Sequence, residues 1–170
     1  MKPSLSYRLT QFIIKLKGLK KNFSKAPIDY KRIRKEDVKV PKGSFFTQNI
    51  RHRFELRKTR ITEIAATETP EQLLLFVHGG AFVSGPAQIH WDAAKQIAKQ
   101  TQCAIWMCDY PKAPEHGISE MSENMDAIFD KALERFQANK ITLLGDSVGG
   151  TLITALVQRL VSVSYTHLTL

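Results

Sequence analysis

The sequence predicts an α/β fold built on a doubly wound, mostly parallel sheet. Three apolar runs, at residues 73–77, 103–110 and 140–147, have the length and composition of strands that are covered on both faces. Each run is followed, directly or after a loop, by a segment whose apolar residues recur at helical spacing. Alternation of strand and helix in this order favours parallel strands joined by right-handed crossovers.

Charge is distributed unevenly along the chain of 170 residues, which is long enough for one domain with a sizeable core. The formal net charge is +9, yet residues 41–170 hold thirteen basic and thirteen acidic side chains. Residues 1–40 hold twelve Lys or Arg and three acidic residues, so the whole excess lies there. A basic nucleic-acid-binding face therefore has no support outside this segment, and we expect no nucleic-acid partner.

Residues 4–21 predict an amphipathic basic helix. Its polar side is rich in lysine, and its apolar face carries Leu5, Leu9, Phe12, Ile13, Leu16 and Leu19. Such a helix either covers the domain or lies on an anionic membrane surface. We favour the cap, because one short amphipathic helix binds membranes only marginally without a second anchor. A signal peptide fits poorly, since lysines interrupt the apolar run. Residues 1–44 are thus expected to form a cap helix and a polar linker.

The segment that follows the linker predicts the edge of the sheet. Residues 45–66 alternate and are rich in β-branched side chains, which indicates a pair of antiparallel strands. A turn over residues 67–71 leads into the first buried strand, at residues 73–77. We expect helices over residues 92–101 and 119–138. The second has an inner stripe made of Met121, Met125, Ile128, Phe129, Leu133 and Phe136.

Cys103 and Cys108 lie five residues apart on one expected strand. An odd separation sends the two side chains to opposite faces, so we do not expect them to form a disulfide. They also lack the spacing of zinc ligands. We expect two small buried thiols in a reducing compartment, and therefore a cytoplasmic protein. The sequence implies neither a metal nor an organic cofactor.

A glycine-rich turn joins the last buried strand to the last helix, which is expected over residues 148–160. Ser147 is flanked by Gly145 and Gly149 in the pattern G-x-S-x-G. A serine raised on a tight strand-to-helix turn requires close approach of its neighbours, which explains the two glycines. The start of the helix would also offer free N–H groups to an oxyanion. The alternative is an ordinary helix-capping serine.

Three motifs together resemble one family. They are H-G-G-A-F at residues 78–82, D-Y-P-K-A-P-E-H at 109–116 and G-D-S-V-G-G at 145–150. In their order and spacing the chain resembles the α/β-hydrolase fold, and within it the hormone-sensitive-lipase-like esterases. The resemblance covers residues 45–160, about the first half of that fold. It implies hydrolysis of small carboxylic esters of modest acyl length through an acyl-serine intermediate.

The resemblance also implies roles for individual residues. Ser147 would be the nucleophile, and the backbone N–H groups of Gly79, Gly80 and Val148 would form the oxyanion hole. His78 would brace the oxyanion loop rather than act as a base.

Other polar residues near these motifs are expected to support them. Asp109 and Glu115 would hold the neighbouring loop, and Asp146 would adjoin the serine without being the triad acid. The family often has a third glycine where this chain has Ala81. The remaining histidines before the elbow are expected to be solvated or locally bonded, and they are His52, His90 and His116.

A catalytic triad of this family cannot be completed from the sequence after Ser147. The family's order is serine, acid, histidine. The 23 residues after Ser147 contain no Asp or Glu, and their only histidine, His167, follows too closely for further strands to deliver it. We therefore expect a fragment, truncated after the elbow helix and inactive by itself. Its core would span residues 45–162 and leave the strand at 141–144 with an unpaired edge.

The last eight residues, 163–170, read V-S-Y-T-H-L-T-L. The same eight residues result from translating a transposase sequencing adapter in one frame, so we expect a native gene to break off near Ser162. The alternative is a genuine final strand, which the alternation of residues would allow.

Two further functions remain open at this stage. A non-catalytic ligand-binding protein on the same scaffold is the main alternative, and a serine peptidase of the same fold is a weaker one. The sequence leaves the acyl group, the alcohol and the oligomeric state undetermined.

Overall fold

The computed structural model describes residue 4 and residues 27–162. Most of the expected N-terminal helix and all of the adapter-like segment lie outside these residues. The chain divides into two units, residues 1–35 and 36–170. In the first unit, the expected linker contains a single helical turn, α3 (Tyr30–Ile33), which begins where the Asp29 carboxylate accepts the N–H of Arg32 at 3.0 Å. The short 3-10 turn η1 (Arg34–Glu36) follows.

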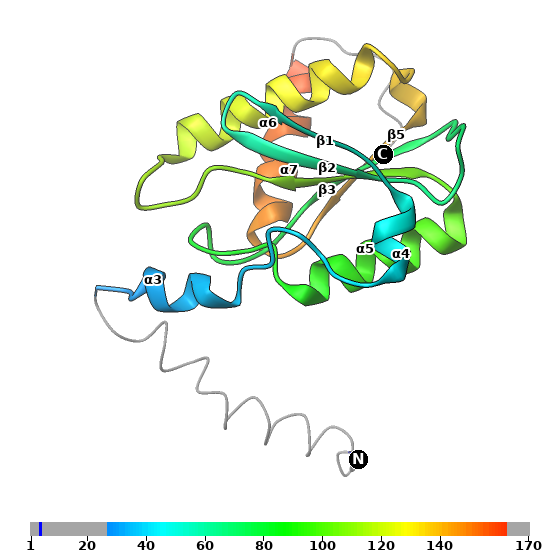
Figure 1. Ribbon diagram of the computed structural model, residues 1–170. Helices are drawn as coiled ribbons and strands as arrows, with labels where there is room; N and C mark the ends of the chain where they lie inside the picture. Colours follow the sequence, from blue (N-terminus) through cyan, green and yellow to red (C-terminus); the bar gives the residue numbers. More distant parts are fainter. Residues whose placement is uncertain (1–3, 5–26, 163–170) are drawn as a thin grey trace. The chain divides into compact units, whose positions relative to one another are not determined.

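The second unit contains a five-stranded sheet of order β1-β2-β4-β3-β5 (Figure 1). Its centre and one edge are parallel, as expected: β3 (Leu73–Val77) pairs with β4 (Ala104–Asp109) and with β5 (Ile141–Gly145). The other edge is the expected antiparallel hairpin of β1 (Ile50–Leu56) and β2 (Thr59–Ile64), and β2 pairs antiparallel with β4. Two of the four pairings are thus parallel and two are antiparallel, so the sheet is mixed, and it contains both the parallel strands and the antiparallel edge that the sequence predicts.

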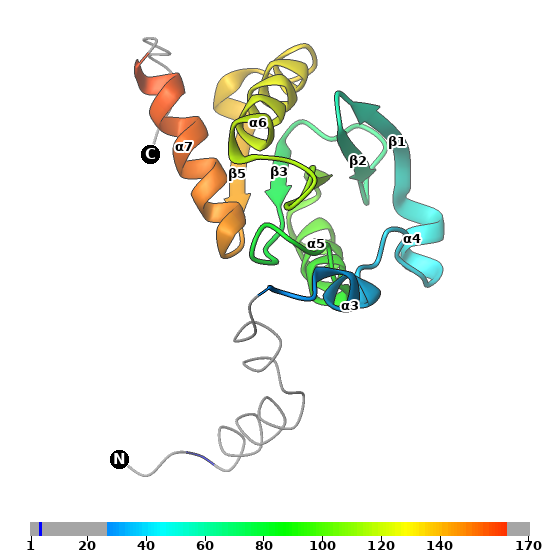
Figure 2. The same cartoon turned by 90° about the vertical axis from the view of Figure 1, so that its left-hand side faces the viewer.

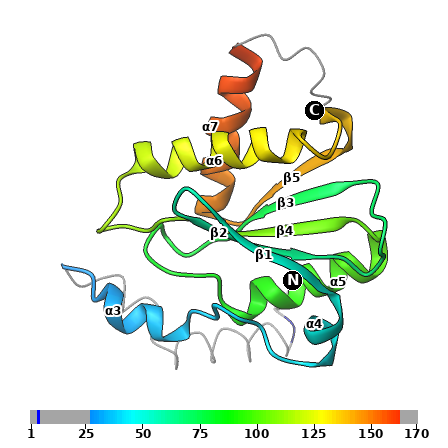
Figure 3. The same ribbon diagram turned by 45° about the horizontal axis from the view of Figure 1, so that its top comes forward.

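Helices cover both faces of the sheet. Figure 3 shows α5 (Gln88–Thr101) on one face and α6 (Ile118–Leu133) with α7 (Val148–Ser162) on the other. Alternate residues of β3 enter the two cores: Leu73 and Leu75 pack with α6 and α7, whereas Phe76 packs with α5. This double burial explains why the strand reads as a continuous apolar run.

One predicted strand segment is a helix instead. Residues 45–49 belong to α4 (Ser44–Asn49), whose first turn follows Gly43 at a φ of +115°. The physical reason is a tertiary contact: Phe46 is 3% exposed and packs edge-to-face on Trp91, with ring centroids 6.1 Å apart. Burial of this ring favours a helical turn over continuation of the hairpin.

Helix and strand boundaries shift by a few residues from those expected. The helix α5 begins at Gln88 rather than at residue 92, and α6 ends at Leu133, although Phe136 beyond its end is still buried. Cys103 precedes β4 and is only half-buried, so the expectation of two buried thiols on one strand is wrong for Cys103. Cys108 is buried, and both thiols are free. None of the helices in the described residues is long and apolar enough to cross a bilayer.

The parallel strands place two loops side by side. In the register of β3 with β5, Val77 lies opposite Gly145, so both strands end at the same level. The residues that follow them, His78 onward and Asp146 onward, therefore meet at one edge of the sheet, where ligands bind in open α/β sheets. Within the described residues, β5 pairs on one side only, and Figure 2 shows it at the end of the sheet beside α7.

Candidate active site

Ser147 occupies a strained turn between β5 and α7. Its φ is +51°, in the left-handed region that non-glycine residues adopt only when the surroundings enforce it. Three backbone hydrogen bonds close the turn: Asp146 N–H donates to Val77 O at 3.0 Å, Gly149 N–H to Asp146 O at 2.8 Å, and Gly150 N–H to Ser147 O at 2.9 Å. Ser147 remains exposed at the surface of this turn.

The two glycines around Ser147 are required by close backbone contacts. A Cβ atom on Gly149 would lie 2.1 Å from Val77 O, and one on Gly145 would lie 2.4 Å from Gly150 N. Neither contact can be relieved by a side-chain rotation, because the atoms that would be met belong to the backbone. The turn therefore needs both glycines to bring α7 against β3.

The loop after β3 folds back on itself. Gly80 has a φ of +129°, and its carbonyl accepts the N–H groups of Val83 and Ser84, each at 3.0 Å. Ala81 and Phe82 follow with φ values of +54° and +63°. Ala81 thus adopts the conformation that favours glycine, which is the residue the family often has at this position.

The loop and the elbow touch at Gly79. A Cβ atom on Gly79 would lie 3.2 Å from Ser147 Cβ and 2.4 Å from Asp146 Oδ2. In the part of the chain that the structure describes, the N–H groups of Gly79, Gly80 and Val148 donate no backbone hydrogen bond. The fold therefore brings the expected nucleophile together with N–H groups that are available to an incoming oxygen.

His78 is fully buried behind this loop. Its Nδ1–H donates to Gly79 O at 2.6 Å, and its ring stacks on Tyr110 with centroids 4.5 Å apart. Its Nε2 lies 3.7 Å from Asp109 Oδ1, too far for a hydrogen bond, and has no hydrogen-bond partner. Burial lowers the pKa of His78, although the nearby Asp109 carboxylate acts in the opposite direction. The lowered pKa favours a neutral ring.

Asp109, at the end of β4, anchors the neighbouring loop. Its carboxylate contacts the ammonium group of Lys112 and lies 3.5 Å from Arg60 Nη2. Burial alone would raise the pKa of Asp109, but the ammonium group of Lys112 holds it below its ordinary value. Tyr110 donates its hydroxyl to His78 O at 3.1 Å, so the D-Y-P-K segment supports the H-G-G loop directly.

Asp146 points away from Ser147 toward a residue that sequence reasoning missed. His90, in the first turn of α5, lies with Nε2 3.1 Å from Asp146 Oδ2, and its Nδ1 accepts the N–H of Ala87 at 2.8 Å. His90 is therefore not merely solvated or locally bonded, because it links segments 56 residues apart. A sequence prediction that began α5 at Gln88 would have placed His90 in the first helical turn and so indicated this contact.

The other two histidines lie where the sequence placed them. His116 contacts Glu120 Oε2 through Nδ1 at 2.7 Å, one helical turn away, and His52 is exposed on β1. Among the described residues, no cluster of three or more His, Cys, Asp or Glu side chains is arranged to hold a metal ion.

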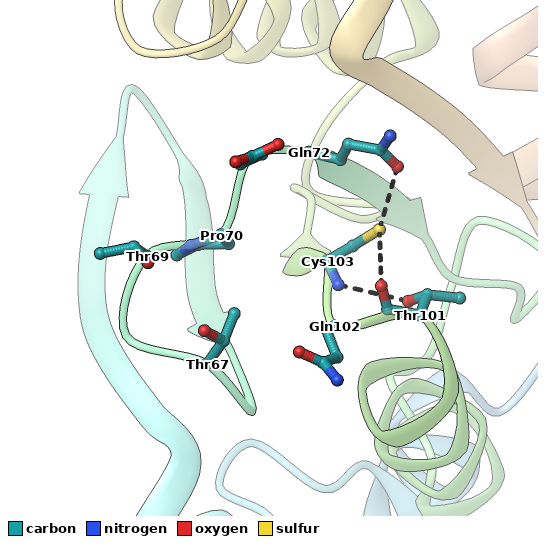
Figure 4. A pocket seen from close by; sticks show the side chains of 8 residues that line it. Thr67, Thr69, Pro70, Gln72, Thr101, Gln102 and Cys103 are labelled. Carbon is teal, nitrogen blue, oxygen red and sulfur yellow. Dashed lines mark hydrogen bonds between the residues drawn. The ribbon is translucent and has the colours of Figure 1, made fainter.

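A separate pocket of about 330 Å³ lies at the opposite end of the strands (Figure 4). Gln72 and Cys103, which precede β3 and β4, line it together with Thr67, Pro70 and Thr101. The Cys103 thiol contacts Gln72 Oε1 at 3.5 Å and Thr101 O at 3.8 Å. Because it lies at the amino ends of the strands, this pocket is remote from Ser147.

Comparisons with known proteins agree with this geometry. Residues 74–169 match the family model described as alpha/beta hydrolase fold. An esterase of Acinetobacter venetianus is 38% identical over 109 residues, which cover 62% of this chain and 35% of that protein. Human arylacetamide deacetylase-like 4 is 31% identical over 102 residues, covering 57% of this chain and 25% of that protein.

A solved structure is similar over a larger part of the chain. The crystal structure of an esterase from the bacterial hormone-sensitive lipase family aligns with a TM-score of 0.64 and 25% identity, over 79% of this chain and 44% of that one. The chain thus spans about a third or less of the two curated relatives and under half of this solved structure.

Proposed function

The chain belongs to the α/β-hydrolase fold family, alongside hormone-sensitive-lipase-like esterases, and we propose that it carries the nucleophile of a serine carboxylic-ester hydrolase. One observation carries the proposal. Ser147 is held in a left-handed turn next to the backbone of Gly79, and the N–H groups of Gly79, Gly80 and Val148 donate no backbone hydrogen bond in the part of the chain that the structure describes. This is the arrangement that acyl transfer through a serine requires.

In the proposed reaction, Ser147 Oγ attacks the ester carbonyl carbon and gives its proton to a general base. The carbonyl oxygen becomes an oxyanion, which accepts hydrogen bonds from the N–H groups of Gly79, Gly80 and Val148. The intermediate then expels the alcohol, which takes up the proton, and leaves an acyl-serine that water hydrolyses. Loss of one such donor typically costs about 3 kcal/mol of transition-state stabilisation.

Three polar residues would support this machinery without reacting. His78 holds the oxyanion loop through Gly79 O, and Asp109 fixes the segment on which His78 stacks. Asp146 directs its carboxylate to His90 rather than to Ser147. These contacts favour loop support over a triad role for all three.

We further propose that the triad acid and histidine belong to residues that continue the native frame. Two observations support this proposal: the chain spans only 35% of the esterase from Acinetobacter venetianus, and no acidic residue follows Ser147. Residues 45–162 would then form the first half of the hydrolase core, residues 1–44 a basic N-terminal segment, and residues 163–170 an artefact of sequence assembly.

Resequencing of the source DNA across the codons for Leu160 to Leu170 tests the proposal first. We expect the frame to continue past Ser162 into strands that bear an Asp or Glu and then a His. The longer product should hydrolyse p-nitrophenyl acetate and butyrate. Ser147→Ala should lower kcat by about 10³-fold or more, whereas Ser119→Ala, at an exposed helix position, should leave kcat unchanged.

The opposite result has a definite meaning. If V-S-Y-T-H-L-T-L is encoded in the DNA and followed by a stop codon, the assembly artefact is ruled out. The enzyme would then give way to the alternative, a non-catalytic ligand-binding protein on the same scaffold.

A further inference from the structure

We propose that His90 is a positioning residue that holds the Asp146 carboxylate away from the oxyanion-binding N–H groups. The catalytic consequence rests on the proposed ester hydrolysis, whereas the contact between the two side chains does not. His90 lies in the first turn of α5 and Asp146 directly precedes Ser147, so the contact ties a third segment to the elbow.

The surroundings of His90 fix both the position and the tautomer of its ring. The side chain is 10% exposed and packs against Phe76 and His78, with ring centroids 6.3 and 5.6 Å away. Because Nδ1 accepts the N–H of Ala87 at 2.8 Å, it carries a lone pair in this direction. The proton of the neutral ring is therefore on Nε2, and this N–H donates a hydrogen bond to Asp146 Oδ2, with 3.1 Å between the nitrogen and the oxygen.

The carboxylate that accepts this hydrogen bond lies against the oxyanion loop. Asp146 is fixed through its own backbone, since its N–H donates to Val77 O and its carbonyl accepts from Gly149. Its Oδ2 occupies the space that a Cβ atom on Gly79 would enter, only 2.4 Å away. Gly79 thus leaves room for the carboxylate as well as for a substrate.

A carboxylate in this place is a potential competitor for the oxyanion hole. Free backbone N–H groups at the start of a helix attract anions, and Asp146 is the anion nearest to them in sequence. Its side chain is 55% exposed, so little packing restrains it apart from His90. The hydrogen bond from Nε2 gives the charge a partner outside the hole and leaves the N–H groups of Gly79 and Val148 available.

Hydrogen–deuterium exchange of this chain, read by mass spectrometry, separates the two hydrogen bonds of His90. His90→Gln places an amide donor near the position of Nε2 and so retains the contact with Asp146. His90→Asn places an amide oxygen near the position of Nδ1, where it can accept the N–H of Ala87. The asparagine side chain is too short to reach Asp146. His116→Asn is the matched control, because it makes the same substitution at another histidine that contacts a carboxylate.

We expect His90→Asn to slow exchange about tenfold in peptides covering residues 77–82 and 145–150, because the released carboxylate then accepts their free N–H groups, with β4 and α6 unchanged. His90→Gln should stay within about twofold of the wild type, and His116→Asn should not alter these peptides. Equal exchange in all variants would overturn the proposal. Equal effects of Gln and Asn, or acceleration in these peptides or throughout the sheet, would also overturn it, because His90 would then be only a packed core residue.

Kinetics of the longer product distinguish this inference from the proposed function. We expect His90→Asn to lower kcat for p-nitrophenyl butyrate about tenfold with little change in KM. His90→Gln should retain most of the wild-type kcat. If the wild-type product hydrolyses no ester, the proposed function fails while the exchange result still decides the contact. If it hydrolyses esters and His90→Asn is fully active, the positioning role is wrong.

Discussion

Two adjacent glycines in the first turn of α7 differ in what a methyl group would meet. A Cβ atom on Gly149 would lie 2.1 Å from Val77 O, whereas one on Gly150 would lie 3.6 Å from Gly145 O, an ordinary contact. We expect Gly149→Ala to lower the free energy of unfolding by about 3 kcal/mol, because backbone must move. Gly150→Ala should raise it by up to about 1 kcal/mol through helix propensity.

Urea unfolding followed by tryptophan fluorescence measures both changes, and each glycine serves as the control for the other. Equal effects of the two substitutions would mean that helix propensity, rather than the contact with β3, decides the requirement at position 149.

The largely buried carboxylate of Asp109, whose side chain is 10% exposed, makes a pH-dependent contribution to stability. Its pKa is held below its ordinary value in the folded chain, so it stabilises the fold above about pH 4, the value of an unfolded Asp. This contribution is lost as the pH falls through the folded pKa. We expect Asp109→Asn to lower the free energy of unfolding by about 2 kcal/mol at pH 7. The deficit should narrow below about pH 4.

Unfolding curves at a series of pH values test this expectation. Asp130→Asn, at an exposed position on α6, is the matched control and should change stability little at any pH. A deficit for Asp109→Asn that stays constant into acid would show that the carboxylate acts through shape rather than charge.

The local conformation of a residue could be predicted from the sequence where a motif carries its own geometry. The pattern G-D-S-V-G-G indicates Ser147 and its flanking glycines because only small residues allow that turn. The contact of His90 with Asp146 could not be predicted, since it depends on where α5 begins. With the helix expected from residue 92, His90 would lie in a loop, whereas α5 begins at Gln88 and places it in the first turn.

Secondary-structure elements were predictable where burial on both faces leaves a continuous apolar run. The three parallel strands meet this condition, and their bounds differ from expectation by only a few residues. The helix α4 was not predictable, because Phe46 is held by Trp91, a residue 45 positions away. The start of α5 was hidden for another reason: its N-cap, Ala87, has no side-chain oxygen, and His90 rather than a Glu or Gln at the third helical position accepts the Ala87 N–H.

The open edge of β5 should govern the solubility of this chain. Within the described residues β5 pairs only with β3, and unpaired edges template aggregation. We expect low soluble expression, and Thr142→Lys, at an exposed position on β5, should raise the soluble fraction roughly twofold or more. Gln96→Lys on the exposed side of α5 adds the same charge away from the edge.

Centrifugation and light scattering of the two lysine variants measure this effect. If Gln96→Lys improves solubility as much as Thr142→Lys, net charge rather than the strand edge limits the solubility of the chain.

At the scale of the whole molecule, the register of the parallel strands assembles the site. The ends of β3, β4 and β5 bring the H-G-G loop, the D-Y-P-K segment and the elbow to one edge, as the order of the motifs predicted. A complete triad could not be predicted, because no Asp or Glu follows Ser147 in the sequence.

The 170-residue chain is therefore expected to show no turnover of p-nitrophenyl acetate. A serine hydroxyl is a weak nucleophile without an adjacent base. Neither nearby histidine is placed to act as one: both nitrogens of His90 are engaged, and His78 is buried against Gly79 O and Tyr110. An oxyanion hole by itself retains only about 10³–10⁴-fold acceleration over water, far below the rate of a complete triad.

Hydrolysis by the purified chain, measured beside Ser147→Ala, decides the point. Equal and negligible rates are expected, because neither His78 nor His90, the two histidines near Ser147 among the described residues, is placed to act as a base. Turnover that disappears in Ser147→Ala would contradict this expectation. A base would then have to lie within these 170 residues, and His90→Gln and His78→Gln would identify it, since only the substitution at the true base would abolish the rate. The absence of turnover in both proteins, together with activity in the longer product, would locate the base in the residues that follow Ser162.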